Sequence, residues 1–283
     1  MLWWVIACFA GALAVALFAP LLLAVGRKQL LHPRTALIAW FGAFFTGITL
    51  TLAGLIVSAV ASLSPPAQVG AVDSLLLHGV AWLGLGGFGA LAAYVATSAE
   101  PLVEQQRAAV HALAPVARSR EARAGFTLVR FTSSDPVAFA VPGRSPEIFV
   151  SSALEALLSK PQFDAVLAHE YAHLRHRHGW ALCIAQVNAA VLVRLRAGQA
   201  LLRATSLLVE LAADDVAARQ AGAANLGNAL SILATRQGDA AMMVRAERLT
   251  NKRWPRASRR RLPKAITMAA PVHDHSYIRG VSY

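Results

Sequence analysis

The sequence predicts a protein of two parts, a helical region with three membrane-spanning helices followed by an α+β domain. The chain of 283 residues is 56% hydrophobic and only 15% charged, whereas soluble domains average about 25% charged residues. Three long apolar runs fill most of the first hundred residues, and shorter strand-like and helical patterns follow them. We therefore divide the chain into a transmembrane region (1–98), an α+β domain (99–222) and a helical C-terminal segment with a basic tail (223–283).

Each of the three apolar runs is long enough to cross a bilayer. They cover about residues 1–25, 36–63 and 75–98, and about 20 apolar helical residues span the hydrocarbon core of a membrane. No basic residue precedes the first run, and the run exceeds the apolar core of a cleaved signal peptide. We therefore interpret it as a retained span, and the lipid bilayer as a partner of this protein.

The segment 26–35 orients these spans. It contains Arg27, Lys28, His32 and Arg34 and no acidic residue, and short basic loops remain in the cytoplasm. Three spans then place the N-terminus outside the membrane and all residues after about 99 in the cytoplasm. The net charge of +12 agrees with contact to anionic lipid on that side.

The domain that follows is expected to begin with a helix and a small sheet. Residues 99–125 have a helical pattern, and short β-type runs follow at 126–131, 137–141 and 147–150. The strand 137–141 is our candidate for an exposed sheet edge that pairs with an extended peptide. Ordinary packing inside a sheet explains the same pattern.

The next element is a helix that carries two histidines and a glutamate in the pattern His-Glu-x-x-His. No Pro or Gly interrupts residues 162–178, and apolar residues recur there at helical spacing. His169 and His173 lie one turn apart on one face, so both imidazoles can bind one metal ion. Glu170 lies about 100° round the helix, where a general base that takes a proton from water belongs. A chance occurrence on a polar helix face is the alternative.

A third metal ligand is expected downstream, because catalytic zinc takes three protein ligands and keeps one position open. Glu210 is the candidate, on a helix predicted over 201–220. Asp214 lies one turn further on and can accept a hydrogen bond from a ligand imidazole. Asp215 is expected to be solvated.

The remaining segments are less informative. The run 180–193 is interpreted as a helix on the catalytic core or against the membrane; a fourth span would place Glu210 on the opposite side from His169. Residues 225–235 are expected to be helical. Residues 245–264 hold nine Lys or Arg and one Glu, which is typical of a solvated tail on anionic lipid. Direct nucleic-acid binding is the less favoured interpretation. His176 and His178 are interpreted as residues on a polar helix face.

The segment Val166–His178, together with Glu210–Asp214, resembles regulatory membrane metallopeptidases of the BlaR/MecR type, within the wider Glu-zincin group. The resemblance implies a zincin-like (minigluzincin) metalloprotease domain that binds one Zn²⁺ per chain. In it His169, His173 and Glu210 are the metal ligands, Glu170 is the catalytic base, and Asp214 orients a ligand.

The same resemblance implies an endopeptidase of the bacterial inner membrane, with several spans and a cytoplasmic active site. Its protein substrate would be a regulator such as a DNA-binding repressor. Two alternatives are a quality-control protease of the HtpX-like kind and a non-catalytic signalling protein on the same fold. The chain after residue 220 has no room for the extracellular penicillin-binding domain of the sensor proteins, so direct β-lactam sensing is not expected.

Overall fold

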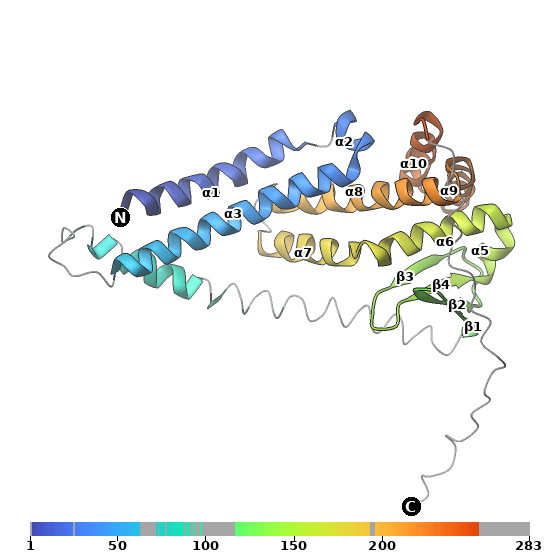
Figure 1. Cartoon of the computed structure of the whole chain (residues 1–283), viewed down its shortest axis with the longest axis horizontal. Coiled ribbons are helices and arrows are strands. Elements are labelled where there is room, and N and C mark those ends of the chain that lie inside the picture. Colours follow the sequence, from blue (N-terminus) through green and yellow to red (C-terminus); the bar gives the residue numbers. More distant parts are fainter. Residues whose placement is uncertain are drawn as a thin grey trace, which may run out of the picture.

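Two long apolar helices form the N-terminal part of the protein. The computed structural model describes residues 2–24, 26–62, 117–192 and 196–254, with shorter pieces between 72 and 97. Helix α1 (Leu2–Leu22) packs along α3 (Pro33–Ser62), and short α2 (Arg27–Leu31) joins them (Figure 1). By length and composition both long helices can cross a membrane.

These two helices match the first two predicted spans, while the third is not confirmed. In the range predicted for it, 75–98, the structure describes a shorter apolar helix over Ser74–Gly87. The rest of that range lies largely outside the described residues.

A four-stranded mixed sheet follows, with the spatial order β1-β2-β4-β3. Strands β2 and β4 are parallel, and the two outer strands pair antiparallel to them. The bounds are β1 (Ala117–Arg123), β2 (Phe126–Phe131), β3 (Ala138–Val141) and β4 (Glu147–Ser151). The three predicted strands are confirmed as β2, β3 and β4.

The helix predicted over 99–125 is wrong for residues 117–123, which form β1. This strand is an outer strand with mostly exposed, charged side chains, so it lacks the apolar alternation of a half-buried strand. Its antiparallel pairing with β2, a tertiary contact, decides its conformation. Residues 101–116 lie outside the described residues.

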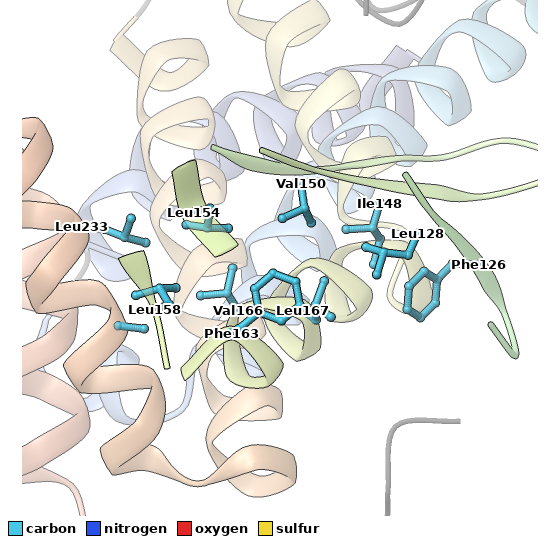
Figure 2. Close-up of a cluster of buried hydrophobic side chains, with 11 residues drawn as sticks. Phe126, Leu128, Ile148, Val150, Leu154, Leu158, Phe163, Val166, Leu167 and Leu233 are labelled. Atoms are coloured by element: carbon cyan, nitrogen blue, oxygen red, sulfur yellow. The ribbon is translucent and has the colours of Figure 1, made fainter. Parts of the chain in front are cut away.

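One face of the sheet packs on the helices that follow. Helices α5 (Ser152–Leu157) and α6 (Lys160–Arg175) and part of α9 (Ala223–Gln237) cover this face. Figure 2 shows the resulting core, in which side chains of β2 and β4 meet those of the helices. Fully buried members include Leu128, Ile148 and Leu167. This packing fixes α6 against the sheet.

Two further helices form an antiparallel hairpin that extends back along the N-terminal helices. Helix α7 (His178–Val191) leads away from the sheet and α8 (Arg196–Ala221) returns beside α6 (Figure 1). Ala36 and Trp40 of α3 share one buried cluster with side chains of both hairpin helices: Ala185, Leu201, Ala204 and Leu208. The apolar run 180–193 is thus half of a hairpin. Because α8 returns, Glu210 lies on the same side as His169.

The last described helix corrects the expectation of a solvated tail. Helix α10 (Ala240–Asn251) packs on α9, and it begins where the Asp239 side chain accepts backbone N–H groups of the first turn. Arg245, Arg248 and Lys252 have largely buried side chains in ion pairs with acids of α8. The part of the basic segment up to residue 254 is therefore folded against the domain.

Candidate metal centre

The structure brings three potential metal ligands together. Nε2 of His169 and Nε2 of His173 lie 3.1 Å apart. The carboxylate of Glu210 lies 3.4 Å from the first nitrogen through Oε2 and 3.6 Å from the second through Oε1. Two atoms bound to one tetrahedral zinc at about 2.0–2.1 Å are roughly 3.3 Å apart. The two imidazole nitrogens are close to this separation, and one donor atom from each of the three residues lies within 4.8 Å of the others, so the donor set fits a zinc ion.

The local fold explains this convergence. Helix α6 begins at a capping box between Ser159 and Gln162 and runs without interruption through the two histidines. His169 is buried and His173 is half-buried. Helix α8 passes beside α6 and brings Glu210 to the same point. One turn of α6 separates the two histidines, and the packing of α8 on α6 adds Glu210 to them.

A second set of side chains contacts the three ligands from outside. Nδ1 of His169 lies 3.0 Å from Oδ1 of Asp214, whose side chain is fully buried. Nδ1 of His173 lies 3.2 Å from Nδ1 of His178. Oε2 of Glu210 lies 2.9 Å from Nη1 of Arg245. Each ligand therefore has an outer partner from a different element.

The arrangement assigns the protonation of the His173–His178 pair. Because Nε2 of His173 faces the ligand group, its Nδ1 carries the proton and donates to Nδ1 of His178. Burial and the neighbouring imidazole of His173 lower the pKa of His178 to about 3, so this side chain is a neutral acceptor. Such partners fix the ring orientation of a metal-binding histidine.

The charges of the centre favour a cation between its carboxylates. Burial lowers the pKa of His169, but the carboxylates of Asp214 and Glu210 outweigh it and raise the value to about 10. Burial raises the pKa of Glu210, yet His169 and Arg245 bring it down to about 2. Positive charge at His169 is thus stabilised in the absence of an ion, and a bound Zn²⁺ is an alternative source of that charge.

Glu170 is placed between the ligand group and the sheet. Burial, supported by the charge of Glu210, raises its pKa to about 7, while His169 and Arg245 act in the opposite direction. The backbone N–H of Ala140 in β3 approaches the carboxylate and stabilises its charged form. A carboxylate with a pKa near neutrality is suited to accept a proton and release it again.

Two imidazoles, one carboxylate and an adjacent glutamate on a mixed sheet and helix scaffold define the class of metallopeptidases. The sequence model of Peptidase family M48 matches residues 101–243, and the chain belongs to this family. M48 proteins are peptidases and are generally zinc-dependent. A comparison with curated proteins found no match. The narrower resemblance to the BlaR/MecR type is not supported by these comparisons and stays a prediction.

All five residues predicted for the site lie together, and their roles stay predictions. Sequence reasoning missed His178, Arg245 and the burial of Asp215. His178 was interpreted as a polar-face residue, but Arg177 adopts a left-handed conformation (φ 52°) that separates α6 from α7, and His178 is buried. Asp215 was expected to be solvated, but it is buried and paired with Arg248 and Lys252.

Proposed function

We propose that this chain is a membrane-anchored zinc endopeptidase that binds one Zn²⁺ through His169, His173 and Glu210. The observation that carries the proposal is the convergence of one donor atom from each of these residues, all within 4.8 Å of one another, with a titratable glutamate beside them. Family membership independently supports peptide-bond hydrolysis.

In this mechanism zinc would polarise a peptide carbonyl and activate water for attack on it. Glu170 accepts a proton from water and later delivers it to the leaving amine. His169 and His173 are held in orientation by Asp214 and His178. Burial raises the pKa of Glu170 to about 7, so its carboxylate can take up and release a proton near neutral pH.

The edge of β3 is the proposed binding surface for the substrate backbone. Ser151 N–H donates to the Val137 carbonyl, so residues 137, 139 and 141 face β4 in the antiparallel ladder. The backbone groups of Ala138 and Ala140 therefore face away from β4, and Ala140 N–H approaches Glu170. A peptide added as a strand at this edge would run past the catalytic carboxylate.

The membrane anchor is inferred from α1 and α3. Large apolar side chains on both are exposed, including Trp3, Leu22 and Ile38, which suits a lipid environment. Nη2 of Arg34 lies 2.9 Å from Nε2 of His176 at the end of α6. This contact supports a topology in which the basic turn 26–35 and the catalytic helices lie on one side of the membrane, which by the positive-inside rule would be the cytoplasmic side.

The proposed substrate is a transcriptional repressor in a signalling system, as the resemblance to the BlaR/MecR type implies. Degradation of damaged membrane proteins is the alternative. Substrate trapping by full-length Glu170→Gln in cells, followed by mass spectrometry, separates the two. One enriched DNA-binding protein supports regulatory cleavage, whereas many unrelated membrane proteins support quality control.

The function itself is tested by zinc content and cleavage of the detergent-purified full-length chain. We expect about one zinc per chain in the wild type, and its loss in His169→Ala/His173→Ala. Glu170→Gln should keep the zinc and lose peptide cleavage by about 10²- to 10⁴-fold, the usual contribution of a general base. A folded wild type that takes up no zinc, or a fully active Glu170→Gln variant, contradicts the proposal.

A further inference from the structure

The guanidinium of Arg245 contacts two of the candidate metal ligands and the aspartate beside them. Its Nε and Nη2 donate to the two oxygens of Asp214 at 2.9 and 2.7 Å. Its Nη1 lies 2.9 Å from Oε2 of Glu210, and its Nη2 lies 3.4 Å from Nε2 of His169. The side chain is only 11% exposed. One buried cation thus contacts three residues of the candidate site.

These contacts fix both carboxylates. The two-pronged pair with Asp214 holds the plane of the carboxylate that faces Nδ1 of His169. Nη1 of Arg245 binds Oε2 of Glu210, and the other carboxylate oxygen, Oε1, faces Nε2 of His173. A planar guanidinium can serve two carboxylates at fixed angles, whereas a lysine ammonium acts as a single point charge.

Helix α10 holds Arg245 in place through two more cations on the same face. Arg248 and Lys252 both donate to the carboxylate of Asp215, at 2.7 and 2.8 Å. They also donate to the backbone carbonyls of Leu30 and Leu31 at the end of α2, at 2.8 and 3.1 Å. The positions 245, 248 and 252 follow helical spacing and lie on one face of α10. The contacts of these three side chains with α8 and α2 therefore hold this face of α10 against the domain.

We propose that Arg245 is a positioning residue of the metal centre, which sets the orientation of Glu210 and Asp214 for zinc binding. The inference rests on the proposed zinc site. Two effects of this side chain oppose each other: its positive charge repels a metal ion, and its geometry orders two acidic groups. Because the charge is already paired with two carboxylates, the ordering effect outweighs the repulsion, and loss of Arg245 weakens zinc binding.

The test compares Arg245→Gln, Arg245→Lys and the control Arg236→Gln in the full-length, detergent-purified chain. Arg236 is exposed near the end of α9, and among the described residues no hydrogen bond or ion pair joins it to the site. Zinc affinity is measured by competition with a chelator of known affinity. Thermal unfolding of the metal-free chain is followed in parallel, so that loss of fold is separated from loss of metal affinity.

We expect Arg245→Gln to weaken zinc binding by about 10-fold or more, the usual effect of removing an outer partner of a metal ligand. Arg245→Lys should weaken it too, although the charge is kept, and Arg236→Gln should stay within about twofold of wild type. If Arg245→Gln binds zinc as tightly as wild type or more tightly, charge repulsion dominates and the inference is wrong.

A purely structural role is also distinguishable. In that case Arg245→Lys would lower the unfolding temperature and leave the zinc affinity of the folded chain unchanged, which overturns the inference. Should Arg245→Gln fail to fold, Arg245→Lys decides alone, and wild-type affinity in that variant refutes the positioning role. A folded wild type that binds no zinc would instead refute the proposed function.

Discussion

Two neighbouring aspartates on α8 allow a sharp test of how the metal centre is supported. Asp214 and Asp215 are both buried, but they face different partners. Asp214 contacts Nδ1 of His169 at 3.0 Å and pairs with Arg245. Asp215 pairs with cations of α10 and touches no proposed ligand among the described residues. Replacing either by Asn removes one buried charge at nearly constant volume.

We expect Asp214→Asn to weaken zinc binding by about 10- to 100-fold, because the partner that orients His169 is lost. This range corresponds to roughly 1.4–2.8 kcal/mol of binding free energy. Asp214→Ala is harsher, since it leaves the Arg245 charge short of a partner; breaking a buried ion pair costs about 3–5 kcal/mol of stability. Asp214→Asn is therefore the variant for affinity measurements.

Asp215→Asn is the matched control. It loses the ion pairs with Arg248 and Lys252 and should lower the unfolding temperature. Its zinc affinity should stay within about threefold of wild type, because Arg245 keeps its own contacts with Glu210 and Asp214. Chelator competition and thermal melts of both variants provide the data. Equal loss of zinc affinity in the two variants would refute the specific link between Asp214 and His169.

Three further predictions concern the histidine pair, the sheet edge and the core. His178→Ala should weaken zinc binding about 10-fold in the same competition assay, because the acceptor for Nδ1 of His173 is lost; unchanged affinity would refute this. Ala138→Pro should keep fold and zinc, since the Ala138 N–H faces away from β4 and is not the group that approaches Glu170, but should strongly reduce cleavage of extended peptides in a chromatographic assay; undiminished cleavage would exclude strand addition at this edge. Phe149→Ala should destabilise the chain by about 3–5 kcal/mol in denaturant unfolding, because Phe149 is fully buried and stacks on Phe139 at 5.1 Å; a loss below 1 kcal/mol would contradict this packing.

The parts of the fold that were predictable from sequence are those with local signals. Helix α6 has uninterrupted helical periodicity, and the His-Glu-x-x-His spacing determines which of its side chains share a face. The strands β2 and β4 carry buried runs of apolar residues. Both features arise from residues that are neighbours in the sequence, so they could be predicted without knowledge of the tertiary contacts.

The parts that were missed depend on contacts between distant segments. Arg245 looks like one more cation of a basic tail, because its partners Asp214 and Glu210 lie more than thirty residues earlier in the chain. His178 looks like a continuation of the polar face, because the left-handed residue Arg177 gives no sequence signal of its own. Strand β1 is polar and becomes a strand only by pairing with β2.

The buried cluster between α3 and the hairpin α7–α8 limits which fragments of this peptidase can fold without the N-terminal helices. Ala36 and Trp40 are buried against Ala185 and Leu208, on the same two helices that carry His178 and Glu210. A fragment that begins at residue 117 would expose this apolar surface to water, and it would leave Arg248 and Lys252 without the carbonyls of α2. Helix α3 and the hairpin α7–α8 therefore share one buried core. Substitutions in α3 can consequently alter catalysis without touching the site itself.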